Sequence, residues 1–192
     1  MGRAPFILLV LMSILGLCYN VTLFPQRLFK SRYRRIRDIP GSKTILIAMA
    51  WGVVTTLYPY LSITGRLSPQ TLLIFFLATL LVFVRTAFFE ILDMQGDRIV
   101  GKETIAIFLG EKRSMRLLKT LLVAVLIVLM SSMAIGWIAM SGIALAFCPL
   151  FLLTVLTVYE KGHLLPGIRL EFFVETNFLL AGILAALGTW LL

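Results

Sequence analysis

Three carboxylates follow a long apolar run in the middle of the sequence. Glu90, Asp93 and Asp97 are separated by three and four residues. Offsets of three and seven residues fall within about 60° of one another on a helix, so the three side chains share one face if the helix continues to Asp97. Like charges on one face repel each other unless a cation lies between them. Oxygen-only ligation favours magnesium or calcium over zinc. The spacing therefore predicts a hard-cation site with these three residues as ligands.

Cationic residues and glycines follow these acids directly. Arg98 and Lys102 carry positive charge, and Gly96 and Gly101 let the backbone turn closely around a ligand. Magnesium in proteins commonly keeps waters and binds the phosphates of a substrate. A metal that bridges phosphate oxygens, with cations that neutralise the remaining charge, is what a diphosphate requires. The alternative, which spacing alone leaves open, is a solvated acidic loop balanced by its basic neighbours.

The composition predicts an integral membrane protein. Of 192 residues, 60% are hydrophobic and only 14% are charged, whereas a soluble domain carries about 25% charged residues. A helix needs about 20 apolar residues to cross a bilayer. Apolar runs of about this length cover residues 5–24, 42–64, 69–92, 117–135, 141–158 and 172–192. We expect an all-α, polytopic membrane helix bundle with about six transmembrane helices, forming a single domain over residues 1–192.

The basic residues are distributed unevenly among the connections. The first connection holds Arg27, Lys30, Arg32, Arg34, Arg35, Arg37 and Lys43. The third and fifth connections are also basic, while the second holds only Arg66 and the fourth has no Lys or Arg. This is the positive-inside pattern, which predicts cytoplasmic odd connections, a cytoplasmic acidic cluster and external termini in a cell (inner) membrane. Anionic lipids are the expected partners of the net charge of +9. Nucleic acid is not, because aromatic residues are not interleaved with the basic ones.

The string EILDMQGDRIVGKETIAIFLG, residues 90–110, resembles a known motif. It is similar to the second aspartate-rich motif of the UbiA superfamily of intramembrane prenyltransferases, D-x-x-D-x-x-G-D-R-x-x-G-x-x-T-x-x-x-x-L-G. The matching residues are Asp93, Gly96, Asp97, Arg98, Gly101, Thr104, Leu109 and Gly110. Glu90 stands where an Asp is usual, which keeps the charge and lengthens the side chain.

Other segments extend the resemblance over nearly the whole chain. Tyr19, the basic stretch and DIPGSKT at residues 38–44 look like the connection before the family's fifth helix. ETNFLLAG at residues 175–182 looks like the opening of its last helix. Family members have nine helices and a first acidic motif, N-D-x-x-D-x-x-x-D, which has no counterpart here. By this comparison the chain corresponds to helices four to nine and is N-terminally incomplete relative to the family.

The resemblance implies transfer of a prenyl group from a prenyl diphosphate to a lipophilic, often aromatic acceptor, with Mg²⁺ as cofactor. Asp93 and Asp97 are then catalytic and hold the metal, with Glu90 as the third ligand. The diphosphate-binding residues are Arg98, Lys102 and Tyr19. Glu175 and Asn177, at the start of the last span, are candidates for the acceptor or tail pocket.

Three functional hypotheses remain at this point. The first is a prenyltransferase, and the second is a catalytically inactive, truncated or split subunit that acts with a separate N-terminal polypeptide. The third, a transporter, would place acids in mid-span or at broken helices near the midplane. It ranks last, because Glu90, Asp93 and Asp97 lie at one end of a span.

Overall fold

The computed structural model describes residues 3–21, 35–137 and 143–190. These residues are helical with short connections and contain no β-strand, which confirms the predicted all-α class. The basic residues Arg27, Lys30, Arg32 and Arg34 lie outside the described residues, as do the ends of several predicted spans. The chain divides into two compact units, Met1–Glu111 and Lys112–Leu192, and each is described by itself.

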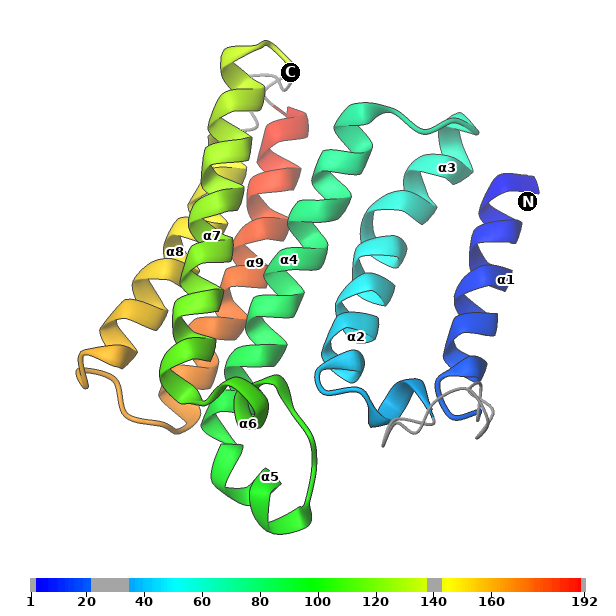
Figure 1. Ribbon diagram of the computed structural model, residues 1–192. Coiled ribbons are helices and arrows are strands. Elements are labelled where there is room, and N and C mark those ends of the chain that lie inside the picture. The colour runs from blue at the N-terminus through cyan, green and yellow to red at the C-terminus, as the bar shows by residue number, and fades with distance from the viewer. Residues whose placement is uncertain (1–2, 22–34, 138–142, 191–192) are drawn as a thin grey trace. The chain divides into compact units, whose positions relative to one another are not determined.

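The first unit contains three long helical rods and a group of short helices. Its elements are α1 (Arg3–Cys18), η1 (Ile36–Asp38), α2 (Ser42–Gly52), η2 (Val53–Leu57), α3 (Tyr58–Thr64), α4 (Pro69–Leu92), α5 (Met94–Val100) and α6 (Ile105–Leu109). The rod made by α2, η2 and α3 packs extensively against α4 (Figure 1). The short helices η1, α5 and α6 lie at the end of the unit where α2 begins and α4 ends (Figure 1).

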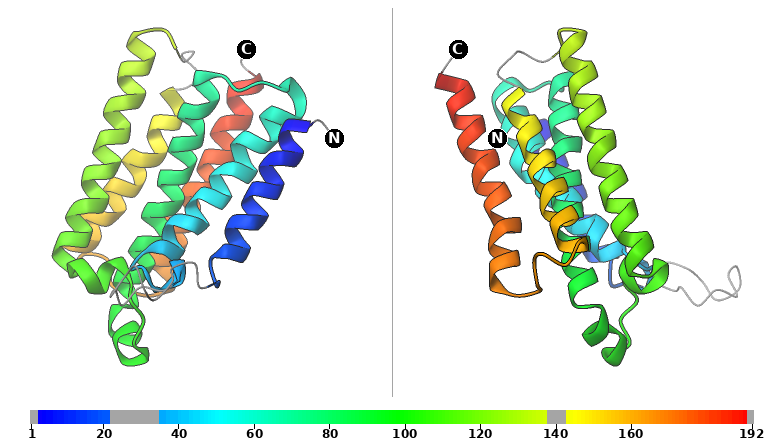
Figure 2. Two further views of the ribbon diagram at one scale, coloured as in Figure 1. Left: turned by 45° about the vertical axis from the view of Figure 1, so that its right-hand side comes forward. Right: turned by 90° about the vertical axis from the view of Figure 1, so that its left-hand side faces the viewer.

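The second unit contains α7 (Glu111–Ala134), α8 (Ile143–Glu160) and α9 (Ile168–Trp190). Helices α8 and α9 pack against each other and run in opposite directions (Figure 2). The Nζ atom of Lys119, near the start of α7, forms an ion pair with Glu160 at the end of α8. The start of α7 and the end of α8 therefore lie at the same end of this unit.

Four helical stretches are long and apolar enough to cross a membrane among the described residues. They are Ser42–Thr64, Pro69–Leu92, Glu111–Ala134 and Ile168–Leu187. The helices Arg3–Cys18 and Ala144–Glu160 are apolar but shorter. The six predicted runs thus all contain helix, and four of them meet the length and composition of a full span.

A π-helical segment, η2, interrupts the rod between α2 and α3. Pro59 explains it, because proline has no N–H for the carbonyl of Thr55 and its ring crowds that carbonyl. The chain widens here, and the N–H of Tyr58 bonds to the carbonyl of Val53, five residues back. The hydroxyl of Thr55 donates to the carbonyl of Trp51 at 2.7 Å. Such internal hydrogen bonds are needed because the hydrocarbon core offers no water to backbone groups.

Gly52 sets the distance between α2 and α4. A Cβ atom at this position would lie 2.0 Å from Oγ1 of Thr79 and 3.0 Å from the ring of Phe75, both on α4. Small residues at membrane helix interfaces allow such backbone approach. The absence of a side chain at Gly52 is therefore a packing requirement.

We predict that Gly52→Ala lowers the free energy of unfolding by about 1–3 kcal/mol, the usual cost of overpacking a close contact. Thermal unfolding in one detergent measures it. The matched control is Gly182→Ala in α9, where an added Cβ would meet no atom within 4 Å. We expect no loss of stability in the control. Equal melting temperatures for Gly52→Ala and the unmodified chain would contradict the packing role.

Candidate active site

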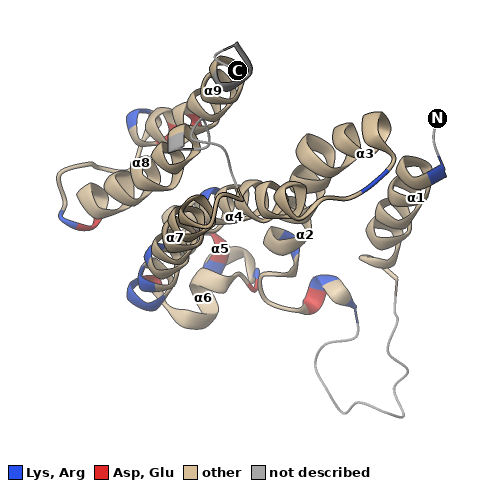
Figure 3. Ribbon diagram, turned by 90° about the horizontal axis from the view of Figure 1, so that it is seen from above, with Lys and Arg blue, Asp and Glu red and all other residues tan. Residues whose placement is uncertain are grey.

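A polar cavity of about 410 Å³ opens at the end of the first unit that carries the short helices. It is bordered by the end of α1, the connection from η1 into α2, the last turn of α4 and the connection into α6. The lining residues are Tyr19, Arg37, Asp38, Ile39, Gly41, Ser42, Lys43, Glu90, Gly101, Lys102, Glu103 and Thr104. Acidic and basic residues gather in this part of the unit, whereas α1 and α4 are largely uncharged along their lengths (Figure 3).

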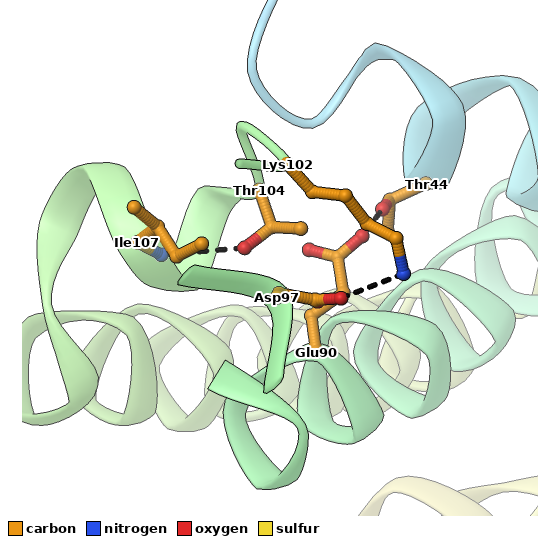
Figure 4. Close-up of polar contacts among 6 residues, drawn as sticks. All are labelled: Thr44, Glu90, Asp97, Lys102, Thr104 and Ile107. Carbon is orange, nitrogen blue, oxygen red and sulfur yellow. Dashed lines mark hydrogen bonds and ion pairs between the residues drawn. The ribbon is translucent and has the colours of Figure 1, made fainter. Parts of the chain in front are cut away.

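A hydrogen bond between α2 and α4 fixes the carboxylate of Glu90. Thr44 is fully buried, and its hydroxyl donates to Oε1 of Glu90 (Figure 4). The second oxygen, Oε2, is buried and has no hydrogen-bond partner among the described residues. Glu90 also lines the cavity. One carboxylate oxygen is therefore used for structure, and the other keeps its capacity to bind a ligand.

The connection into α6 packs directly on the start of α2. Gly41 has a φ of 77°, and a Cβ added to it would lie 2.2 Å from Cγ1 of Ile105. Both the backbone conformation and the space therefore require glycine there. The hydroxyl of Thr104 caps α6 by accepting the N–H of Ile107 at 3.3 Å (Figure 4). These contacts place residues 101–104 on the wall of the cavity.

Asp97 holds Lys102 in place through two interactions. Oδ1 of Asp97 accepts a hydrogen bond from Nζ of Lys102 at 2.7 Å (Figure 4), and the Lys102 N–H bonds to the Asp97 carbonyl at 3.0 Å. Asp97 is buried, while 60% of the Lys102 side chain is exposed. Gly101 makes the turn with a φ of 73°.

The carboxylate of Asp97 raises the pKa of Lys102 above its ordinary value of 10.5. A cation whose pKa is raised on folding contributes its full stabilisation below the ordinary pKa, and the contribution is lost as the pH rises through the raised value. Lys102 therefore keeps its positive charge throughout the physiological pH range.

Three of the predicted site residues line the cavity together. They are Tyr19, Glu90 and Lys102. Tyr19 comes from the end of α1, Glu90 from the last turn of α4 and Lys102 from the connection into α6. The structure thus brings together residues from three separate segments.

The other predicted acids and Arg98 lie differently. Helix α4 ends at Leu92, and Asp93 is its C-cap, so the single continuous helix that would align all three carboxylates is not formed. Asp93 and Arg98 are exposed, Asp97 is buried against Lys102, and none of these three is among the cavity-lining residues that the structure describes.

The donor set fits magnesium, although it does not form a cage. Among the described residues, no group of three or more His, Cys, Asp or Glu is placed to hold a metal. Magnesium needs only one or two carboxylates when waters and substrate phosphates complete its shell. Glu90 presents an unpartnered oxygen at the cavity, and Asp97 acts on it electrostatically. Carboxylates at this place match a magnesium ion shared with a phosphate ligand.

Arg37 and Lys43 also line the cavity, and sequence reasoning attributed them to membrane topology. Arg37 forms an ion pair with Asp38 at 3.7 Å, and Asp38 accepts the Arg35 N–H at 2.9 Å. These contacts fix the turn that leads into α2. The signal that could have identified both cations is their closeness to Gly41 in a segment already noted for its family resemblance.

Glu175 and Asn177 are not brought together. Asn177 is fully buried in α9, and neither of its amide atoms has a hydrogen-bond partner among the described residues. Glu175 is exposed. Residues two apart on a helix do not face each other, so α9 directs these side chains to different surroundings.

Comparison with protein families agrees with the motif. Residues 1–176 match the family model of the UbiA prenyltransferase family. The chain belongs to the UbiA prenyltransferase family. No curated protein and no solved structure matches it. Membership in UbiA, together with four apolar helices of spanning length, identifies a membrane protein of the prenyltransferase type.

We predict that Thr44→Val lowers the free energy of unfolding by about 1–3 kcal/mol, because it leaves the Glu90 carboxylate without its hydrogen-bond donor. Thermal unfolding in detergent measures the change. Thr154→Val is the matched control, since the Thr154 hydroxyl is exposed and bonds only to the Leu150 carbonyl of its own helix. An equal and small effect of both substitutions would show that the contact with Glu90 does not stabilise the unit.

Proposed function

We propose that this chain is a magnesium-dependent prenyltransferase that binds the diphosphate of a prenyl diphosphate in the cavity of the first unit. The observation that carries the proposal is the composition of this cavity. Arg37, Lys43 and Lys102 line it together with Glu90, which has an unpartnered carboxylate oxygen. Cations beside an available carboxylate suit a phosphate ligand that shares a metal. The prenyl group is transferred to a lipophilic, often aromatic acceptor.

The chain's own residues bind and neutralise the diphosphate. The ammonium of Lys102 has three donors, and Asp97 accepts from it at 2.7 Å, so N–H groups remain for phosphate oxygens. Tyr19 offers its hydroxyl from the opposite wall, and Arg98 adds positive charge nearby. Charge that develops on the leaving diphosphate is stabilised by these preorganised groups.

Glu90, Asp93 and Asp97 are the residues that would hold magnesium. When bound, the ion supplies Lewis-acid neutralisation of the diphosphate. Thr44 orients Glu90 for this role through its hydrogen bond, and Lys102 orients Asp97.

We assign Asn177 and Glu175 to the acceptor or tail side of the reaction. The amide of Asn177 is fully buried and carries both a donor and an acceptor without partners among the described residues. A buried polar group without a partner is costly, and a hydroxyl or carbonyl group on an acceptor would satisfy it.

A second candidate function is a subunit of the same family that binds diphosphate without transferring it. It is favoured by the acidic groups, since no three of them are placed to hold a metal within the described part of the chain. A separate polypeptide carrying a further acidic motif would then complete the site. Product formed by the purified chain from geranyl diphosphate and an aromatic acceptor supports the enzyme, whereas binding without product supports the subunit.

We further propose a cell (inner) membrane location with the cavity facing the cytoplasm and both termini outside. The charge pattern supports this orientation. Arg35, Arg37 and Lys43 precede or begin α2 at the cavity end. Arg66 lies in the connection at the other end of the first unit. Cytoplasmic connections are enriched in Lys and Arg.

We predict that Asp97→Asn and Glu90→Gln each weaken the binding of geranyl diphosphate in the presence of magnesium about tenfold or more, because each removes a charged ligand interaction worth more than about 1.4 kcal/mol. Asp93→Asn tests the third predicted ligand in the same way. Calorimetry in detergent, with magnesium and with a chelator, separates metal-dependent from metal-independent affinity.

The control for these variants is Glu111→Gln, which removes one exposed carboxylate outside the cavity. Melting temperatures show which variants remain folded. Unchanged magnesium-dependent affinity in folded Asp97→Asn and Glu90→Gln would refute the metal-site assignment.

We predict that single cysteines at Arg66 and Lys112, introduced after replacement of Cys18 and Cys148, react from opposite sides of the membrane. Both positions are exposed. A membrane-impermeant thiol reagent applied to intact cells should label position 66 and label position 112 only after permeabilisation. Labelling of both positions from one side would contradict the proposed orientation.

A further inference from the structure

An apolar groove of about 300 Å³ runs between α1 and α2 in the first unit. Met12, Leu15 and Gly16 line it from α1, and Leu46, Ile47 and Ala50 line it from α2. The two helices lie side by side with their lengths roughly parallel (Figure 1). The groove therefore follows the direction in which the helices cross the membrane.

The groove adjoins the polar cavity. Tyr19 and Lys43 line both spaces. Beyond them, on the cavity side, lie the cations Arg37 and Lys102, and on the groove side the lining is apolar. An amphiphile with an anionic head and a hydrocarbon tail matches this change of chemistry, with its head in the cavity and its tail in the groove.

We propose that the groove between α1 and α2 holds the isoprenoid tail of the prenyl diphosphate whose head occupies the cavity. The proposal rests on the proposed function and adds the path of the tail. The tail passes Tyr19 and Lys43 and then lies along Gly16 and Met12. Burial of each methylene raises affinity about fourfold, so the groove favours prenyl groups that are long enough to enter it.

Gly16 is the position at which this path can be tested. It lies three residues before Tyr19, which is about 4.5 Å along a helix. A Cβ atom built at Gly16 would meet no atom within 4 Å. A larger side chain can therefore occupy the groove at this point without clashing with the protein.

The experiment compares Gly16→Leu with Ser13→Leu. Ser13 is exposed on the same helix and does not line the groove, so its variant controls for added apolar surface. The purified chain is titrated in the presence of magnesium with inorganic pyrophosphate and with dimethylallyl, geranyl and farnesyl diphosphates. We expect Gly16→Leu to weaken farnesyl diphosphate binding by at least about tenfold, the equivalent of two displaced methylenes. Pyrophosphate and dimethylallyl diphosphate should bind as they do to the unmodified chain, and Ser13→Leu should bind every ligand normally.

The outcomes separate the groove from the function. Unchanged farnesyl diphosphate affinity in Gly16→Leu, or equal weakening of all four ligands, overturns the groove as the tail site while leaving the cavity as the head site. Failure of the unmodified chain to bind any of the prenyl diphosphates refutes the proposed function itself. Weakening that grows with tail length only in Gly16→Leu supports both.

Discussion

The hydrogen bond from Thr44 to Glu90 is the interaction on which the candidate site depends. It joins the first turn of α2 to the last turn of α4, in a buried environment where an isolated carboxylate is costly. One oxygen of Glu90 is satisfied by the hydroxyl, and the other remains available at the cavity. The same contact therefore stabilises the helix pair and positions a candidate ligand.

Two glycines make this hydrogen bond possible. Gly52 lets α2 approach α4 so closely that a Cβ would lie 2.0 Å from the Thr79 hydroxyl. Gly41 lets Ile105 pack over the start of α2, which brings the connection with Lys102 to the cavity. The charged residues lie on short segments whose positions are set by apolar and backbone packing. The chemistry of the cavity thus follows from close contacts in which no charge takes part.

The sequence was sufficient for the class of fold and for the family, because both depend on local patterns. Apolar runs and the spacing from Glu90 to Gly110 are properties of consecutive residues. The relation among the three carboxylates was harder to predict, because it required α4 to continue beyond Leu92. Instead Asp93 ends the helix, with a φ of −89° and a ψ of 5°.

Contacts between distant segments had no comparable signal. Nothing in the type or spacing of Thr44 indicates that it meets Glu90, since 46 residues separate them. Arg37 and Lys43 matched a topological charge pattern, and such a pattern gives the side of the membrane without the position in a cavity. The burial of Asn177 and the exposure of Glu175 likewise depend on how α9 packs, which its apolar composition does not specify.

The one departure from the family motif has a structural reason in this chain. Glu90 stands where the motif usually has Asp, and its side chain is one methylene longer. That length lets the carboxylate extend from α4 to the hydroxyl of Thr44 on the neighbouring helix while its second oxygen stays at the cavity. A shorter Asp at this position would have to give up the contact with α2 or draw the helices closer, and Gly52 already leaves no room for a closer approach. The longer side chain and the missing Cβ at Gly52 are therefore two parts of one arrangement, in which the distance between α2 and α4 is fixed at one point by packing and at another by a hydrogen bond.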